Sequence, residues 1–229
     1  MLAKFKKKYI ADWDFYQKYL LLAIPMILQN AITNLVSFLD NIMVGQLGTE
    51  QMSGVAIVNQ LIFVQYQGGS NAQVILYEKQ NGSWKEDFSC QGYVGGNGID
   101  KVKEGDRKTP TGVFGFTKAF GIKDNPGAKL PYTKLNPYLY WCGDEQWYNT
   151  LVDVREIHHE CSGEHLISYV PHYNYVLAID YNPQCIFGKG SAIFLHCTGS
   201  NPYTGGCVAV SESNMIRIMQ TVDKGAKIC

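Results

Sequence analysis

The stretch Ser191–Val210 (SAIFLHCTGSNPYTGGCVAV) contains the residues best suited to chemistry. An apolar run ends at His196, a turn-rich loop follows, and Gly205-Gly206-Cys207 leads into a second apolar run. A thiol is a strong nucleophile as its thiolate, and a neighbouring imidazole can take the thiol proton. Glycines let the backbone approach a substrate and leave N–H groups for an oxyanion. The stretch therefore indicates cysteine-based acyl transfer, with a buried cysteine and a structural histidine as the alternative.

Each residue of this stretch has a candidate role and a plainer alternative. Cys207 is the candidate nucleophile, or else a small buried hydrophobe. His196 is the candidate base that later protonates the leaving amine, or else a strand-end histidine bonded to a loop carbonyl. Gly206 and the Cys207 N–H are candidates for oxyanion stabilisation, or else parts of an ordinary turn. Thr204 and Tyr203 are expected to line the substrate pocket.

A third group should orient the His196 imidazole, and the sequence does not name it. A backbone carbonyl is one candidate. The Gly and Pro content of Gly105-Asp106 and of Thr109–Gly112 predicts a rigid turn before a strand, with a structural role.

A second histidine-rich segment, HHECSGEH, contains three histidines and a cysteine: His158, His159, Cys161 and His165. Three imidazoles and a thiolate would suit zinc, but this spacing matches no metal motif, so no metal and no cofactor are expected. We expect His165 and Glu164 to be a surface histidine and a solvated carboxylate, with a substrate-loop role as the alternative.

Composition and charge exclude some functions for the 229-residue chain. The formal net charge is zero, and no basic stripe alternates with aromatic residues, so we expect no nucleic-acid partner. The one basic run, KFKKK over residues 4–8, precedes a hydrophobic stretch and is typical of membrane-flanking charge. The seven cysteines form no paired C-x-x-C units, so a structural zinc ribbon is not expected.

A change in composition near Gln65–Ser70 predicts two modules, residues 1–66 and residues 67–229. In the first module, the apolar stretch Tyr19–Val44 is long enough to span a bilayer. The run Met52–Val64 is short for a span, so we expect a marginal second membrane helix or an interfacial one. The sequence therefore predicts one or two hydrophobic, transmembrane-like helices before the second module.

The second module has the pattern of a mainly β domain with a C-terminal helix. Apolar alternation and turn residues predict a hairpin from Ala72–Tyr77 through the turn Gln80–Ser83 to a strand beginning at Trp84. Further strands are expected at Tyr173–Tyr181 and Ser191–His196. A helix is expected over Ser211–Val222, because Ser211 can cap it and Met215, Ile218, Met219 and Val222 fall on one face.

The first module resembles the start of a multidrug and toxic compound extrusion (MATE) transporter over residues 12–64. The resemblance rests on FYQKYLLLAIPMILQNAITNLVSFLDNIMVGQLG, in particular on Pro25, Gln29, Asn30, Asp40 and the NIMVGQLG run. Such transporters are built from many spans, and at most two are expected in this chain. The alternative functions are thus a truncated or misjoined transporter fragment with no transport of its own, or a membrane anchor.

The second module resembles the L,D-transpeptidase (YkuD-like) catalytic domain family over residues 72–228. Its most specific blocks are GDRKTPTGVFGF (Gly105–Phe116) and GKGSAIFLHC...TGGCVAV (Gly188–Val210). Three further blocks carry the resemblance: AFGIKDNPGAKLPY, SGEHLISY and YNYVLAIDYN. The resemblance implies a β-rich fold, a cysteine nucleophile and bacterial peptidoglycan stem peptides as substrate. The donor would be a stem tetrapeptide cut before its terminal D-alanine. The acceptor would be a side-chain amine, or water in a carboxypeptidase.

The sequence around Cys207 departs from the family pattern of Ser-His-Gly-Cys, an apolar residue and Arg. Here the order is Thr204-Gly205-Gly206-Cys207-Val208-Ala209, so one imidazole and the guanidinium are absent. A guanidinium at that position would hold geometry or bind a carboxylate, so recognition of the donor is expected to differ.

Two competing functions for the second module follow from these patterns: a transpeptidase, or a wall-binding domain that has lost catalysis. The basic residues 4–8 favour a cytoplasmic N-terminus. A single span then places the catalytic domain on the cell-wall side of the cell membrane, whereas two spans would return it to the cytoplasm.

Overall fold

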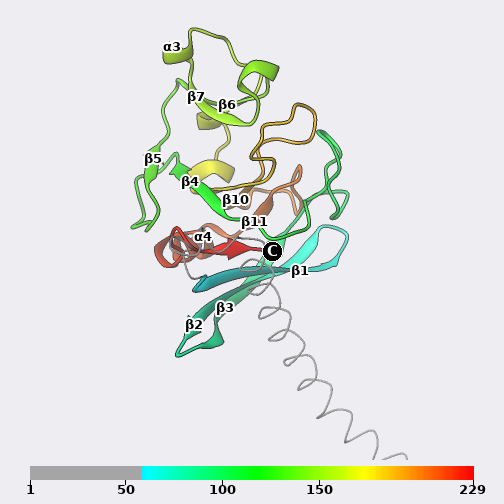
Figure 1. The fold of residues 1–229 in the computed structure, drawn as a ribbon, viewed down its shortest axis with the longest axis vertical. Helices are drawn as coiled ribbons and strands as arrows, with labels where there is room; N and C mark the ends of the chain where they lie inside the picture. Colours follow the sequence, from blue (N-terminus) through cyan, green and yellow to red (C-terminus); the bar gives the residue numbers. More distant parts are fainter. Residues whose placement is uncertain (1–57) are drawn as a thin grey trace, which may run out of the picture. The chain divides into compact units, whose positions relative to one another are not determined.

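Alternating apolar residues build the sheets of the β-rich unit, which a computed structural model describes over residues 58–229 (Figure 1). The large sheet contains, in spatial order, β12 (Lys227–Ile228), β1 (Gln60–Gly68), β2 (Asn71–Gln80), β3 (Ser83–Tyr93), β11 (Val208–Val210), β10 (Phe194–Cys197), β9 (Val176–Ile179), β4 (Phe116–Gly121) and β5 (Tyr132–Lys134). The small sheet contains β7 (Thr150–Asp153), β6 (Leu139–Cys142) and β8 (Glu164–His165). The helices are α3 (Val154–Ile157) and α4 (Glu212–Thr221), with short 3₁₀ turns η2 (Glu145–Trp147), η3 (Leu166–Ser168) and η4 (His172–Asn174). The predicted mainly β fold with a C-terminal helix is confirmed for these residues.

The predicted hairpin is present as β2 and β3, which pair antiparallel along their whole length. Asn81 and Gly82 form its two-residue turn with φ of 53° and 80°. Both angles lie in the left-handed region that a type I′ hairpin turn requires and that Asn and Gly adopt most readily.

Strand β1 corrects the interpretation of the second apolar run. The run Met52–Val64 was expected to be helical, but Gln60–Val64 lie in β1, which pairs with β2 and β12. Periodicity alone does not separate a short apolar helix from a buried strand, and the ladder to β2 decides the outcome. The expected boundary between residues 66 and 67 falls inside this strand, so β1 belongs to the β-rich unit.

The predicted span Tyr19–Val44 and the run before residue 58 lie outside the described residues. Within residues 58–229, no helix is long and apolar enough to cross a membrane.

The centre of the large sheet is the short parallel pair β10 and β11, and its two faces are buried against different elements. Leu195 and Cys197 point to the face that α4 covers with Met215 and Ile218. Phe194, at the alternate position, packs on the opposite face with aromatic residues, including Trp141 and Tyr173. His196 shares this second face with Phe194, because side chains two residues apart in a strand point the same way.

Two other predicted elements are present: a strand that is shorter than expected, and a helix whose two caps are the expected end residues. The expected strand Tyr173–Tyr181 is shortened to Val176–Ile179, because Tyr173 belongs to the 3₁₀ turn η4. Helix α4 matches its prediction: the Ser211 hydroxyl accepts a hydrogen bond from Asn214 N at 3.4 Å, and Met215, Ile218 and Met219 are buried.

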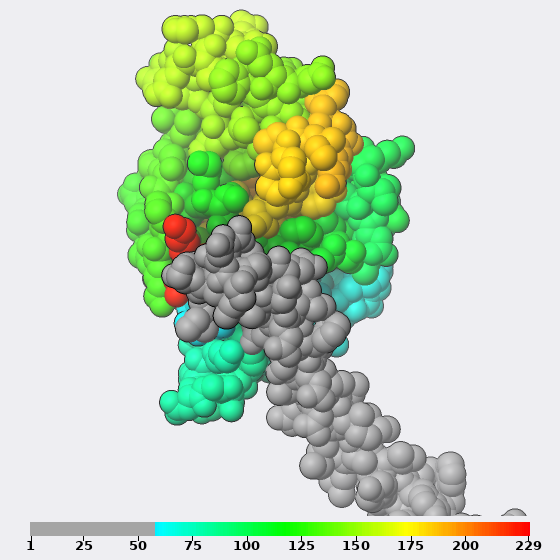
Figure 2. Space-filling view, viewed as in Figure 1, coloured from blue at the N-terminus to red at the C-terminus, as the bar shows by residue number. Residues whose placement is uncertain are grey.

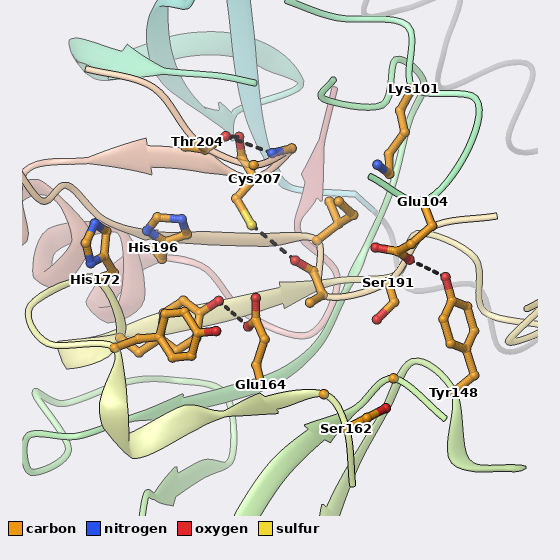
Figure 3. Close-up of a pocket in the computed structure, with 18 of the residues that line it drawn as sticks. Lys101, Glu104, Tyr148, Ser162, Glu164, His172, Ser191, His196, Thr204 and Cys207 are labelled. Carbon is orange, nitrogen blue, oxygen red and sulfur yellow. Dashed lines mark hydrogen bonds between the residues drawn. The ribbon is translucent and has the colours of Figure 1, made fainter. Parts of the chain in front are cut away.

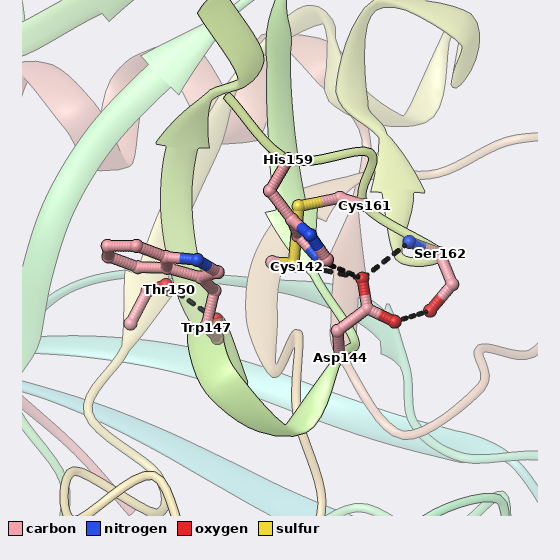
Figure 4. The surroundings of a disulfide bond; sticks show 7 residues. All are labelled: Cys142, Asp144, Trp147, Thr150, His159, Cys161 and Ser162. Atoms are coloured by element: carbon pink, nitrogen blue, oxygen red, sulfur yellow. Dashed lines mark hydrogen bonds and ion pairs between the residues drawn. A yellow bond between two sulfur atoms is a disulfide. The ribbon is translucent and has the colours of Figure 1, made fainter. Parts of the chain in front are cut away.

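The small sheet belongs to a segment that projects from the β-rich unit, and the yellow-green surface in Figure 2 shows this projection. A disulfide joins Cys142, at the end of β6, to Cys161, just before β8, across 19 residues of sequence (Figure 4). Asp144 lies in the enclosed loop and accepts hydrogen bonds from the Ser162 backbone and hydroxyl. The crosslink thus joins the end of β6 to the segment that leads into its partner strand β8.

We expect the Cys142→Ala/Cys161→Ala double variant to lose about 3 kcal/mol of unfolding free energy, because a crosslink restricts the unfolded chain. Urea unfolding followed by fluorescence measures this loss, since Trp147 lies within the crosslinked loop and Trp141 directly precedes it. Cys185→Ser is the matched control, because Cys185 is a free, partly exposed cysteine. An unchanged unfolding midpoint in the double variant would show that the crosslink does not stabilise the native fold.

Candidate active site

A cavity of about 900 Å³ contains every site residue that the sequence singled out (Figure 3). His196 from β10 and Cys207, directly before β11, lie in its wall, and the preceding loop contributes Tyr203, Thr204 and Gly206. The fold therefore brings together residues separated by a turn-rich loop, as the sequence predicted.

The pairing of β10 with β11 places His196 and Cys207 on one face of the sheet. His196 is opposite Ala209, and Cys207 precedes Ala209 by two residues, so the imidazole and the thiol are diagonal neighbours. Cys207 Sγ accepts a hydrogen bond from Phe194 N at 3.3 Å and lies 3.1 Å from the Ala192 carbonyl oxygen. Both residues are buried, with 5% of His196 and 7% of Cys207 exposed.

The Cys197 carbonyl orients the His196 ring. His196 Nδ1 lies 2.8 Å from Cys197 O, so Nδ1 carries the proton and Nε2 is the acceptor. The rings of Tyr173 and His172 pack edge-on against the imidazole, with centroids 5.6 and 5.9 Å away. The third group, which orients the imidazole, is therefore a backbone carbonyl, as the sequence allowed.

Burial keeps both reactive groups neutral in the free protein. Burial and the nearby Glu164 carboxylate raise the pKa of the Cys207 thiol to about 12, although the Phe194 N–H opposes this rise. Burial lowers the pKa of His196 to about 4. At neutral pH the site therefore contains a thiol and a neutral imidazole, and proton transfer between them is unfavourable in the free protein.

Two threonine hydroxyls hold the carbonyl of Cys207. Thr204 Oγ1 donates to Cys207 O at 2.6 Å, and Thr109 Oγ1 donates to the same oxygen at 3.1 Å. Gly206 N donates to Thr204 Oγ1 at 3.1 Å. The oxyanion role expected of Gly206 thus requires this bond to break. The Cys207 N–H makes no hydrogen bond within residues 58–229, so it is the freer donor.

Gly206 occupies a backbone position that only glycine fits well. Its φ is +147°, and a Cβ there would lie 2.9 Å from Lys108 O. A Cβ on Gly205, by contrast, would meet no atom within 4 Å. The position where the family pattern has a histidine therefore faces free volume in this chain.

The GDRKTPTG block contacts the backbone of Cys207 through Thr109. Asp106 accepts hydrogen bonds from Val102 N, Lys103 N, Lys108 N and Lys101 Nζ at 2.7–3.1 Å. Burial opposes ionisation of Asp106, but these donors hold its pKa well below the usual range. Thr109 then accepts from Gly95 N at 2.8 Å while donating to Cys207 O. The predicted rigid turn is therefore present, and its structural role includes a direct contact with the Cys207 backbone.

Glu164 corrects the prediction of a solvated carboxylate, because it lies in the cavity wall (Figure 3). The Tyr173 hydroxyl donates to Glu164 Oε2, and burial raises the pKa of Glu164 to about 7. A second such pair, Glu104 with Tyr148, lines the same cavity. No periodicity marks Glu164 in the sequence, since β8 is only two residues long.

The histidine-rich segment has structural roles. Cys161 is committed to the disulfide, so it supplies no thiolate to a metal. His159 Nε2 lies 3.0 Å from Asp144 Oδ2, and these two side chains come near the sulfur of Cys142, which is in the same disulfide (Figure 4). His165 Nε2 lies 2.8 Å from Pro137 O, and the ring stacks on Tyr140.

Comparison with solved structures finds matches of low sequence identity. Bd1075 of Bdellovibrio bacteriovorus matches with a TM-score of 0.42 and 14% identity, covering 75% of this chain and 47% of that one. The helical cell shape determining protein Pgp2 of Campylobacter jejuni matches with a TM-score of 0.41 and 21% identity, covering 74% and 46%. The chain thus spans under half the length of these proteins. No curated protein sequence matches the chain.

Two family models match the sequence. The MatE model matches residues 25–75, which overlap the first predicted module. The L,D-transpeptidase catalytic domain model (YkuD) matches residues 55–228, about three quarters of the chain, and includes every residue of the cavity. Both suspected resemblances are therefore confirmed, and the chain belongs to the L,D-transpeptidase catalytic domain family.

Proposed function

We propose that the β-rich unit is a cysteine-dependent L,D-transpeptidase-like acyltransferase that acts on peptidoglycan stem peptides. The observation that carries this proposal is the placement of Cys207 and His196 on one buried face, inside a cavity large enough for a peptide. Membership of the catalytic domain family supplies the substrate class.

In the first step, His196 Nε2 takes the Cys207 proton while Sγ attacks the carbonyl carbon of the donor peptide. The protonated His196 then gives this proton to the leaving amine of the terminal D-amino acid. An acyl thioester on Cys207 remains. Because both groups are neutral at rest, the proton transfer accompanies substrate attack instead of preceding it.

The oxyanion of the tetrahedral intermediate needs donors that are already in place. The Cys207 N–H is the first candidate. The Gly206 N–H joins it only when its hydrogen bond to Thr204 Oγ1 breaks. Tyr203, 43% exposed and beside Arg107 at the cavity rim, is a candidate contact for the peptide.

Ala209 leaves the cavity without the family's guanidinium. The cation that lines the cavity in its place is Lys101, whose ammonium lies 2.9 Å from Asp106 Oδ1. Both side chains of this ion pair are buried, so the Lys101 ammonium is not free to bind a carboxylate of the donor peptide. Donor recognition therefore relies on other groups of the wall.

We further propose that this unit lies on the cell-wall side of a membrane. The Cys142–Cys161 disulfide supports this location, because disulfides persist in oxidising, extracytoplasmic compartments. In intact bacterial cells that express the full chain, a membrane-impermeant maleimide should label the partly exposed free cysteines, and the triple variant Cys90→Ser/Cys185→Ser/Cys229→Ser should lose that label. Labelling that needs prior permeabilisation of the cells would contradict the location.

The nucleophile is tested by intact-protein mass spectrometry with a carbapenem or a donor tetrapeptide. We expect a covalent adduct on the native protein and none on Cys207→Ala. Cys197→Ala is the matched control, since Cys197 is buried on the opposite face of β10. A native protein that forms no adduct would favour the non-catalytic wall-binding alternative.

The loop before the nucleophile is tested with two neighbouring glycines. Gly206→Ala should lower the acylation rate about tenfold or more, because strain displaces the Cys207 backbone from its oxyanion geometry. Gly205→Ala should leave the rate near the native value, since its added methyl meets no atom. Equal rates in the two variants would show that the Gly206 conformation does not matter for acylation.

A further inference from the structure

The cavity that contains Cys207 has a carboxyl group on the wall facing the thiol. Glu164 reaches this wall because β8 pairs with β6, with Glu164 opposite Trp141, and the Trp141 ring packs on Phe194. Figure 3 shows the Glu164 carboxyl pointing toward the space beside Cys207. Glu164 and Cys207 line the same cavity, and the carboxylate raises the pKa of the thiol.

One Glu164 oxygen is free for a ligand. Oε2 accepts the Tyr173 hydroxyl, whereas Oε1 accepts no hydrogen bond within the described part of the chain. Among residues 58–229, no lysine or arginine forms an ion pair with Glu164 or with Glu104 across the cavity. Lys101, the basic side chain of the wall, is neutralised by Asp106. The cavity therefore offers negative charge without a protein cation to balance it.

We propose that Glu164 is the residue that receives the acceptor amine of the second substrate and takes its proton. This inference rests on the proposed function and assigns a residue of this chain to its acceptor step: a carboxylate that receives a primary ammonium group. The amine would enter beside the thioester, with Oε1 of Glu164 as its hydrogen-bond acceptor.

The step balances in protons and electrons. The acceptor R–NH₃⁺ gives one proton to the Glu164 carboxylate and becomes a neutral amine. The nitrogen lone pair attacks the thioester carbonyl carbon, an amide C–N bond forms, and the C–S bond breaks. The second proton leaves the nitrogen through His196 to the Cys207 thiolate, which restores the thiol.

Several titratable groups face Glu164 and share its environment. They are Tyr173, Tyr169, Glu104 and Cys207. Burial is the main cause of the raised Glu164 pKa of about 7, and Glu104 adds to it. The carboxylate form must accept the proton, so aminolysis should rise with pH through this region.

The test compares Glu164→Gln with Glu160→Gln, which removes one exposed carboxylate outside the cavity. A donor tetrapeptide acylates Cys207, and Nα-acetyl-D-lysine amide competes with water for the acyl-enzyme. We expect Glu164→Gln to acylate at least as fast as the native protein, because loss of the nearby negative charge favours the thiolate. Its ratio of amide product to hydrolysed product should fall about 100-fold, and the rise of aminolysis with pH near 7 should disappear.

An unchanged product ratio in Glu164→Gln would overturn the inference. A slower acylation together with a slower aminolysis would also contradict it, since that pattern indicates general damage to the site.

A binding measurement separates this inference from the proposed reaction. Calorimetry with Nα-acetyl-D-lysine amide uses Cys207→Ala as background, in which no acylation occurs. Adding Glu164→Gln should weaken binding about tenfold, because an ammonium loses its charge-assisted hydrogen bond, while adding Glu160→Gln should leave binding unchanged. Equal binding in both double variants would refute the ammonium site even where acylation of Cys207 succeeds. Failure of the native protein to acylate, with binding lost only in the Glu164 variant, would reject the transpeptidase reaction alone.

Discussion

The parallel pairing of β10 with β11 is the constraint on which the site depends. Its register sets His196 opposite Ala209 and thereby brings the imidazole beside Cys207 on one face. A slip of one residue would turn Cys207 toward the α4 side of the sheet, since successive side chains alternate. Leu195, Val208 and Val210 are buried on that side, so the slip would also expose apolar surface to the cavity. Core packing therefore protects the geometry of the reactive pair.

Burial of the pair has a chemical consequence. A preformed thiolate–imidazolium pair needs enough polar stabilisation to offset desolvation of two charges. Here desolvation dominates, and the Glu164 carboxylate further disfavours the thiolate. The resting thiol is thereby protected from indiscriminate alkylation and oxidation, which act on thiolates. The thiol therefore reacts only when bound substrate favours proton transfer from Cys207 to His196. The substrate does so by excluding water and by bringing an electrophilic carbon to the sulfur.

The sequence predicted the parts of the site that depend on residue type and local spacing. His196, Cys207 and the glycines between them are close in the chain, and the short loop leaves few ways to place them. The Asn81-Gly82 hairpin and the Ser211 cap follow from equally local rules. Glu164 was misjudged because its burial depends on pairing with Trp141, more than twenty residues away. Strand β1 was misjudged for the same reason, because only its ladder to β2 distinguishes it from a helix.

The projecting segment that contains β6, β7 and β8 is coupled to the nucleophile through the backbone of Ala192. Asn149 directly precedes β7, and its Oδ1 accepts hydrogen bonds from Trp141 Nε1 at 3.0 Å and Ala192 N at 3.2 Å. Ala192 has a φ of 55°, a left-handed conformation that costs a non-glycine residue energy and persists only where its neighbours hold it. Its carbonyl lies 3.1 Å from Cys207 Sγ. The segment thus both carries Glu164 into the cavity and fixes the carbonyl beside the thiol. A change of structure in the small sheet would therefore alter the electrostatics and the orientation of the sulfur together.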